Sequence, residues 1–125
     1  MRFDPASGLI IVPTQVHGPW GWRSLRLALD TGATGTTVRT ATLYVLGLDP
    51  GTSPDRVEMT TASGVEYVPV VRAPRIVALG RERSDFLVVA HTLPPSSSVD
   101  GVLGLDFFRG LEVRIDFRRG LVSLG

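Results

Sequence analysis

The chain has 125 residues and a mass of 13.5 kDa, which is the size of one domain, so we expect a single domain over residues 1–125. Its 13 basic and 12 acidic side chains leave a net charge of +1, and this balance argues against a nucleic-acid partner. All the basic residues are Arg and Cys is absent, which excludes Walker-type phosphate loops, Schiff-base lysines, thiol nucleophiles and disulfides.

The first part of the chain predicts strands joined by turns. Its 14 Gly and nine Pro divide short stretches rich in Val, Ile, Leu and Thr, a spacing typical of an all-β domain. Strands are expected over 9–16 and 23–29, because apolar and polar residues alternate in the second run and residues 19–21 favour a turn between them. The segment 36–46 predicts a strand followed by a short helical turn, and a loop is expected at 49–54.

The middle of the chain predicts two pairs of strands. Residues 57–60 and 65–71 flank the small residues Thr61-Ala62-Ser63-Gly64, and this pattern predicts a β-hairpin with a tight tip. Two further apolar runs, 76–79 and 86–91, are expected to pair across a charged turn that lies between them.

The last part of the chain predicts a short helix and a final hairpin. Residues 104–109 have room for one or two helical turns, which Gly110 would end. Beyond it, apolar and charged residues alternate from Val113 to Phe117 and turn at Arg119-Gly120, so a hairpin is expected over 113–124.

An acidic residue at the end of a predicted strand is the first candidate for chemistry. The apolar run that ends at Leu29 leads directly into Asp30-Thr31-Gly32-Ala33. A carboxylate at the end of a buried strand is expected to be partly removed from water, and nearby N–H and hydroxyl groups can orient it for proton transfer. The same residues also fit a simple turn, because Asp and Gly are both turn formers.

A second segment, Val99–Phe108, favours the chemical interpretation. Within it an apolar strand ends in Gly104 and leads into the predicted helix. Together with the Asp-Thr-Gly-Ala loop and the intervening hairpin, this order of motifs resembles the retropepsin-like (retroviral-type) aspartic proteases over roughly residues 9–124. The resemblance implies an all-β fold, a small closed barrel of the acid-protease type with one short C-terminal helix, assembled as a homodimer.

The resemblance also implies roles for individual residues. Asp30 would be the catalytic acid, and the hydroxyl of Thr31 would bond across the boundary between two subunits. Gly32 would let backbone N–H groups approach the carboxylate, and Ala33 would line the adjacent wall. The strand beneath this loop would consist of Val102, Leu103 and Gly104. The tip of a substrate-binding flap would consist of Ala62, Ser63 and Gly64.

The implied activity is that of an aspartic endopeptidase. Such enzymes use two carboxylates that share a proton and activate a water molecule, whereas this chain holds one Asp-Thr-Gly. The resemblance therefore implies a homodimer that brings two Asp30 side chains together over a polypeptide substrate, with apolar residues favoured around the cleaved bond and no cofactor.

Three other acids could supply the second carboxylate within one chain, namely Asp100, Asp106 and Asp116. Asp106 fits better as a cap on the N–H groups of the helix that follows it. Asp100 precedes a glycine and favours a turn. Asp116 lies among the charged residues of its strand, where it would pair with Arg114 or Arg118.

Other functions and partners are also constrained. A non-catalytic peptide-binding or dimerisation module that keeps the fold stays open, as does a fragment of a larger precursor. No G-x-S-x-G motif supports a serine hydrolase, and His17 and His91 lie too far apart for a metal-ligand motif, so no metal site is expected. No apolar run is long enough to span a membrane and no targeting segment is seen, so the cytoplasm is the expected location.

Overall fold

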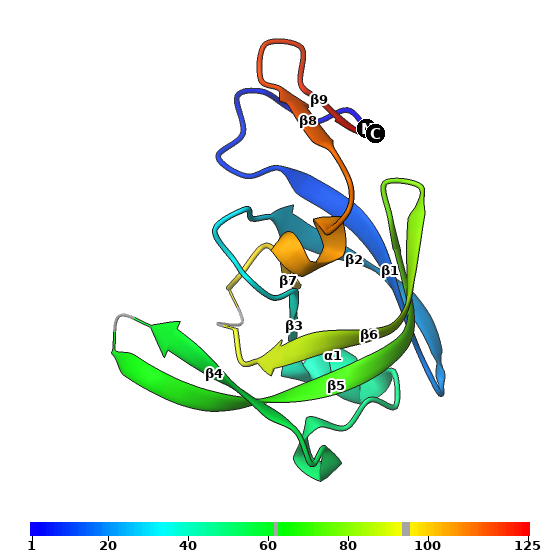
Figure 1. Cartoon of the computed structure of the whole chain (residues 1–125), viewed down its shortest axis with the longest axis vertical. Coiled ribbons are helices and arrows are strands. Elements are labelled where there is room, and N and C mark those ends of the chain that lie inside the picture. The colour runs from blue at the N-terminus through cyan, green and yellow to red at the C-terminus, as the bar shows by residue number, and fades with distance from the viewer. Residues whose placement is uncertain (62, 94–95) are drawn as a thin grey trace.

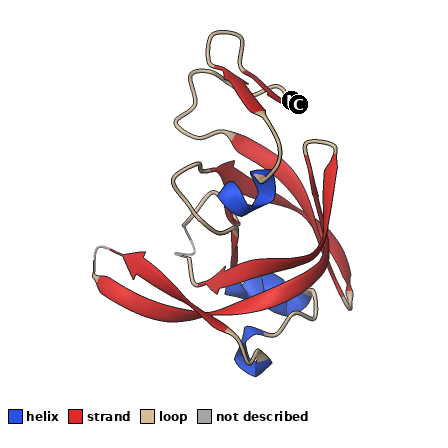
Figure 2. Ribbon diagram, in the orientation of Figure 1, coloured by secondary structure: helices blue, strands red, loops and turns tan. Residues whose placement is uncertain are grey.

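The computed structural model describes residues 1–61, 63–93 and 96–125, with the backbone alone at Thr61. Figure 2 shows that strands make up most of this part of the chain. The strands are β1 (Ile11–Gly18), β2 (Gly21–Leu29), β3 (Thr37–Arg39), β4 (Arg56–Thr61), β5 (Gly64–Ala78), β6 (Arg81–His91), β7 (Gly101–Leu103), β8 (Val113–Asp116) and β9 (Leu121–Leu124). The helical elements are α1 (Thr40–Val45) and two 3₁₀ turns, η1 (Pro50–Thr52) and η2 (Leu105–Phe108).

Six strands close into a barrel, which confirms the predicted architecture (Figure 1). Their order is β1-β2-β7-β3-β6-β5, and β5 returns to pair with β1. β7 runs parallel to β2, and β3 runs parallel to β6, while the other neighbouring pairs are antiparallel. Closure gives each of these strands a neighbour on both sides, which provides partners for its backbone N–H and carbonyl groups. β4 pairs with β5 outside the ring, and the two extend as a hairpin at the lower left of Figure 1.

The core fills the barrel with alternate residues of its strands. Val12, Leu27 and Val88 are fully buried on three different strands, because every second side chain of a strand points to the same face. Leu43 of α1 and Phe107 of η2 complete this core. Burying a side chain of this size contributes about 1.5–3 kcal/mol, so the apolar periodicity is the main source of the barrel's stability.

The helical segments differ in part from the prediction. The expected strand and helical turn over 36–46 are present as β3 and α1. The helix expected near the C-terminus is a single 3₁₀ turn, η2, and the α-helix of the described residues is α1. The chain is already extended at Arg109, where ψ is 131°, so four residues remain for η2.

The turn between β5 and β6 also lies elsewhere than expected. Residues 81–85 were expected in the charged turn but belong to β6, and the turn consists of Leu79 and Gly80. Their φ angles are 53° and 74°, both positive, as a two-residue type I′ hairpin requires. β5 is a single strand of 15 residues. It pairs with β6 from Val70 to Ala78, a register that omits Pro74.

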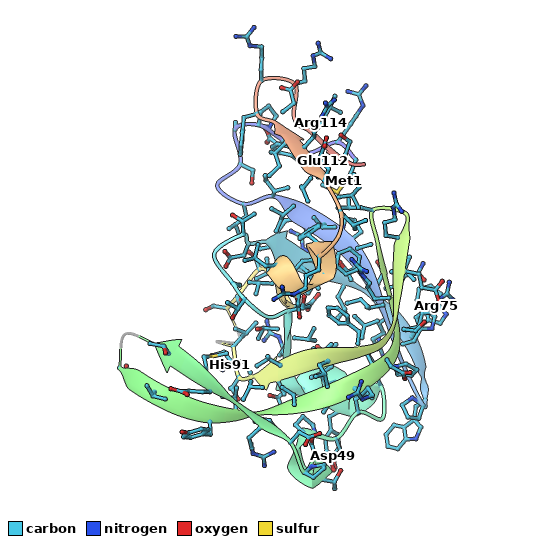
Figure 3. The ribbon with its side chains drawn as sticks, viewed as in Figure 1. Met1, Asp49, Arg75, His91, Glu112 and Arg114 are labelled. Carbon is cyan, nitrogen blue, oxygen red and sulfur yellow. The ribbon has the colours of Figure 1, made fainter. Side chains whose placement is uncertain are left out.

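The predicted final hairpin is present as the two-stranded sheet β8–β9, at the top of Figure 1. The N-terminal residues lie along β9, where Met1 exchanges backbone hydrogen bonds of 2.8 Å with Val122. Figure 3 shows Met1, Glu112 and Arg114 together at this sheet. Along the described ranges of the chain, no helix is long and apolar enough to cross a membrane.

Candidate active site

Asp30 lies immediately after β2, where the chain leaves the barrel. Its N–H donates to the carbonyl oxygen of Leu103 at 3.0 Å, which extends the β2–β7 pairing by one residue. Its Oδ1 accepts a hydrogen bond from the N–H of Gly32 at 2.9 Å. The N–H of Ala33 donates to the Asp30 carbonyl oxygen at 3.2 Å and closes the turn. The backbone of the loop therefore orients the carboxylate.

The expectation that Asp30 is partly buried is wrong for the single chain. Asp30 is exposed, although Leu27 and Ala28 just before it are buried. The reason is its position, because β2 ends at Leu29 and Asp30 lies beyond the edge of the core. The carboxylate is thus held in place yet remains open to water or to a second molecule.

Gly32 and Thr31 are the neighbours of Asp30 in the loop. A Cβ atom added at Gly32 would lie 3.2 Å from Asp30 Oδ1, so a side chain there would crowd the carboxylate. Thr31 is exposed, and its hydroxyl makes no hydrogen bond with any residue that the structure describes. Its bond across a subunit boundary stays a prediction.

The strand β7 lies directly behind the Asp30 loop. Val102 pairs with Ala28 of β2 on one side and with Thr37 of β3 on the other. Leu103 is fully buried. At Gly104, an added Cβ atom would lie 2.7 Å from the carbonyl carbon of Gly35, closer than real side chains approach. Leu103 and Gly104 therefore contact the loop directly, whereas Val102 joins β2 to β3.

Two residues that the sequence analysis did not assign to the loop, Thr36 and Asp106, hold it from behind. The fully buried hydroxyl of Thr36 donates to Asp106 Oδ1 at 2.7 Å and accepts from the N–H of Gly104 at 3.1 Å. The N–H of Thr36 lies 3.0 Å from both Asp106 carboxylate oxygens. Asp106 thereby ties the loop to η2.

The expected cap role of Asp106 is therefore wrong. The N-cap of η2 is Gly104, which makes no side-chain cap bond, and the carboxylate of Asp106 turns to Thr36 instead. The two residues are 70 positions apart. They meet because β3 and β7 are neighbours in the barrel, with Thr37 opposite Val102. Only this register brings them together, and no local pattern signals it.

Asp100 bonds to two strands that flank its loop. Its Oδ2 accepts from the N–H of Arg26 at 2.8 Å, and its own N–H donates to the Arg26 carbonyl oxygen at 2.8 Å. Its carbonyl oxygen accepts from the N–H of Arg39 at 2.8 Å. Asp100 thus connects β2 and β3 at the start of β7, which is a structural task for a loop residue.

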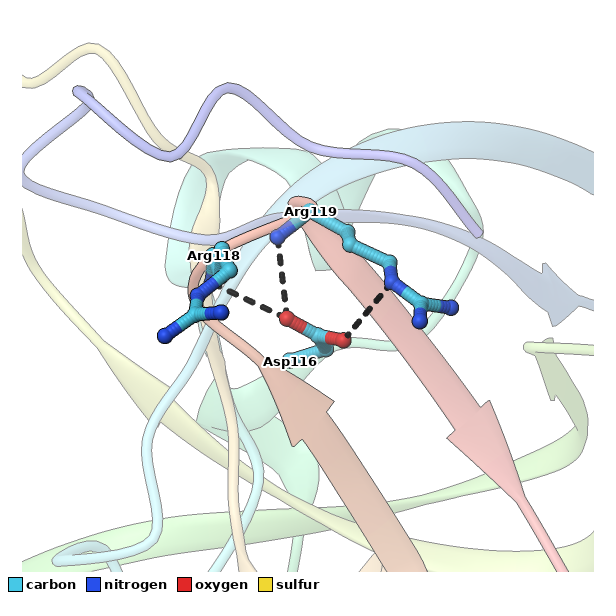
Figure 4. Close-up of polar contacts among 3 residues, drawn as sticks. All are labelled: Asp116, Arg118 and Arg119. Carbon is cyan, nitrogen blue, oxygen red and sulfur yellow. Dashed lines mark hydrogen bonds and ion pairs between the residues drawn. The ribbon is translucent and has the colours of Figure 1, made fainter.

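Asp116 belongs to the turn between β8 and β9 (Figure 4). Its Oδ1 accepts from the N–H groups of Arg118 at 3.0 Å and Arg119 at 2.9 Å. Its Oδ2 lies 3.6 Å from Nε of Arg119. The side-chain partner is therefore Arg119 and not Arg114 or Arg118, because Arg114 pairs with Glu112 at 3.3 Å. This carboxylate stabilises the turn and lies outside the Asp30 loop.

A cleft of about 590 Å³ adjoins the Asp30 loop. On one side it is bounded by residues 32–35 of the loop, and on the other by strands of the β4–β5–β6 side of the barrel. Its apolar lining includes Ala33, Val57, Met59, Val70, Leu87 and Val89. An extended segment of peptide would find apolar contacts here beside the loop that carries Asp30.

The described residues of the predicted hairpin tip are not among those that line this cleft. Ala62 is outside the described residues, while Ser63 and Gly64 are exposed and do not line the cleft. Residues 57–60 of β4 line it instead. Among residues 1–61, 63–93 and 96–125, no three His, Cys, Asp or Glu side chains gather in a group that could hold a metal ion.

Comparisons with known proteins agree with this geometry. Residues 12–107 match the family model described as Aspartyl protease. A solved structure of a retropepsin-like aspartic protease from Rickettsia conorii aligns with 99% of this chain and 86% of its own, with a TM-score of 0.69 and 15% sequence identity, and so shows a shared fold. No curated protein is significantly similar to the chain. Since the matched residues cover most of the chain and include both the Asp30 loop and Gly104, the chain belongs to the aspartyl protease family and has a retropepsin-like fold.

Proposed function

We propose that this chain is an aspartic endopeptidase that works as a homodimer, with one Asp30 from each subunit. The observation that carries the proposal is the Asp30 carboxylate itself, which is exposed and oriented by the N–H of Gly32, in a loop whose following residues line a cleft. Within the same chain, the carboxylate of Asp100 accepts a hydrogen bond from Arg26, and that of Asp106 accepts from Thr36. A second copy related by two-fold symmetry supplies the missing carboxylate most directly.

The chemistry follows from placing two carboxylates side by side. Paired aspartates share one proton, a known property of aspartic proteases as a class, because two adjacent negative charges repel each other. The ionised Asp30 takes a proton from a water molecule, whose oxygen attacks the peptide carbonyl carbon. The protonated Asp30 donates to the carbonyl oxygen and stabilises the tetrahedral intermediate. Protonation of the amide nitrogen then lets the C–N bond break, without a covalent enzyme intermediate or a cofactor.

The substrate in this proposal is an extended polypeptide. The β4–β5 hairpin acts as the flap, with its tip at Ala62, Ser63 and Gly64, and the substrate backbone adds as a strand between the flap and the Asp30 loop. The apolar side chains that line the cleft support the binding of substrate residues near the cleaved bond.

Replacing Asp30 by Asn tests the proposal. Asn keeps a carbonyl oxygen that can accept from the N–H of Gly32, so we expect an unchanged midpoint of unfolding in denaturant. Because the general acid and base are lost, cleavage of an unfolded protein substrate should fall roughly 10³-fold. Cleavage is followed by mass spectrometry of the released peptides. A wild-type protein that binds peptides without cleaving them, or cleavage that persists in Asp30→Asn, would contradict the proposal and favour a binding module.

A further inference from the structure

The cleft beside the Asp30 loop combines apolar walls with negative charge. Two carboxylates, of Glu58 and Asp106, line it, and no Arg is among its lining residues. Asp106 has no ion-pair partner in the described part of the chain. Its hydrogen-bond donors are the N–H and the hydroxyl of Thr36, which are neutral groups. The charge of Asp106 is therefore available to a cation that enters the cleft.

Gly35 has no side chain that would lie next to the Asp106 carboxylate. A Cβ atom at position 35 would lie 4.0 Å from Asp106 Oδ2 and 3.4 Å from Cγ2 of Val89. Gly35 is not among the glycines with positive φ, so its backbone conformation does not demand a glycine. The absence of a side chain leaves room between the cleft wall and the carboxylate.

We propose that this cleft accepts a basic side chain of the substrate, Lys or Arg, whose charged end pairs with Asp106 beside Gly35. The proposal rests on the proposed protease function and adds a substrate preference to it. The aliphatic stem of such a residue packs along Val70, Leu87 and Val89, as the stems of Lys and Arg commonly do on apolar surfaces. Its charged end forms a charge-assisted hydrogen bond with the carboxylate.

Asp106 is a better partner for the cation than Glu58. Glu58 is exposed on β4, where water and salt weaken an ion pair. Asp106 is half-buried, and Thr36 already fixes its carboxylate, so pairing requires less ordering of the acid. Gly35 and Asp106 would thus determine specificity, one by leaving space and the other by its charge.

Pairs of peptides that differ at one position test the inference. One pair is made for each position around the cleaved bond, with Lys at that position in one peptide and norleucine in the other. Norleucine has a straight carbon chain like that of Lys but lacks the ammonium group. We expect the wild type to show a ratio of kcat/KM for Lys over norleucine of roughly tenfold at one position, as hydrogen bonds to charged groups give. Added salt should lower this ratio.

Three variants locate the source of the preference. Asp106→Asn removes the charge and keeps an oxygen for Thr36, while Gly35→Ala keeps the charge and fills the space beside it. Both should bring the ratio close to one. Glu58→Gln, which removes the other acid of the cleft, should leave the ratio unchanged. Because a ratio compares two substrates of one variant, general damage to the loop cancels.

Binding to the Asp30→Asn protein, measured by fluorescence anisotropy of the same labelled peptides, tests the preference without turnover. If the wild type cleaves none of the peptides while Asp30→Asn binds the Lys peptide more tightly than the norleucine peptide, the proposed function is overturned and the basic subsite is supported. Asp30-dependent cleavage with equal use of Lys and norleucine at every position would overturn the subsite alone. A preference that survives Asp106→Asn, or that disappears in Glu58→Gln, would also overturn it.

Discussion

At the scale of single residues, the hydroxyl of Thr36 has two partners and no contact with solvent. Replacing Thr36 by Val keeps the shape of the side chain but leaves the buried N–H of Gly104 without an acceptor and removes one donor from Asp106. An unsatisfied buried group costs about 1–3 kcal/mol, so we expect the free energy of unfolding to fall by about 2–4 kcal/mol. Denaturant unfolding followed by circular dichroism measures this change.

Two matched variants control this prediction. Thr36→Ser keeps the hydroxyl and should recover most of the stability. Thr37→Val alters the neighbouring Thr, whose hydroxyl makes only a long bond of 3.4 Å to the Gly35 carbonyl oxygen, so a loss under about 1 kcal/mol is expected. Equal losses for the two Val variants would show that the Thr36 network adds nothing specific.

Residues differ in how far the sequence predicts their roles. The Asp30 loop could be recognised because its order, a strand followed by Asp-Thr-Gly-Ala, is local. The contact of Thr36 with Asp106 could not be recognised from the sequence, because it depends on the pairing of β3 with β7 across the barrel. The exposure of Asp30 could not be predicted either, because it depends on where β2 leaves the core.

At the scale of elements, β7 carries the closest packing of the site. This three-residue strand lies between β2 and β3, and Gly104 follows it against the Asp30 loop. Replacing Gly104 by Ala places a Cβ atom 2.7 Å from the Gly35 carbonyl carbon and 2.9 Å from the Ala33 carbonyl oxygen. Since backbone must move, we expect a loss of about 2–3 kcal/mol in stability together with reduced cleavage.

Thermal unfolding and peptide cleavage of Gly104→Ala measure the two effects. Gly8→Ala is the matched control, because no atom lies within 4 Å of a Cβ atom at that position. Its stability should stay within about 0.5 kcal/mol of the wild type. If Gly104→Ala were as stable and active as Gly8→Ala, the contact between β7 and the loop would not support the site.

The elements also show why boundaries were harder to predict than strands. The hairpin of β8 and β9 followed from alternation and from the turn signal at Arg119-Gly120. The sequence does not locate the turn between β5 and β6, because Leu79 has a positive φ that its residue type does not favour. The charges of residues 81–85 favour a loop, whereas these residues belong to β6, where Arg83 is half-buried and its four neighbours are exposed. Polarity alone cannot separate these two cases.

At the scale of the whole molecule, one chain is a complete barrel that carries half of the proposed catalytic pair. The barrel closes on its own strands, and β9 is paired on both sides, with β8 and with the N-terminal residues. Folding of the chain and completion of the site are therefore separate steps in the proposal. A monomer would fold without being active, and activity would depend on the fraction of chains that are paired.

Mixing wild-type chains with Asp30→Asn chains tests this dependence. If subunits exchange, wild-type chains are captured in mixed pairs that hold one carboxylate, so activity per wild-type chain should fall to about half in an equal mixture and to about a quarter at threefold excess of the variant. An inert protein at the same mass concentration serves as the control and should leave activity unchanged. Sedimentation velocity on the same samples reports the mass of the species present. A site formed within one chain does not depend on the partner chain. The shared site would therefore be refuted if the mixtures sediment as dimers and exchange subunits, yet activity per wild-type chain stays constant.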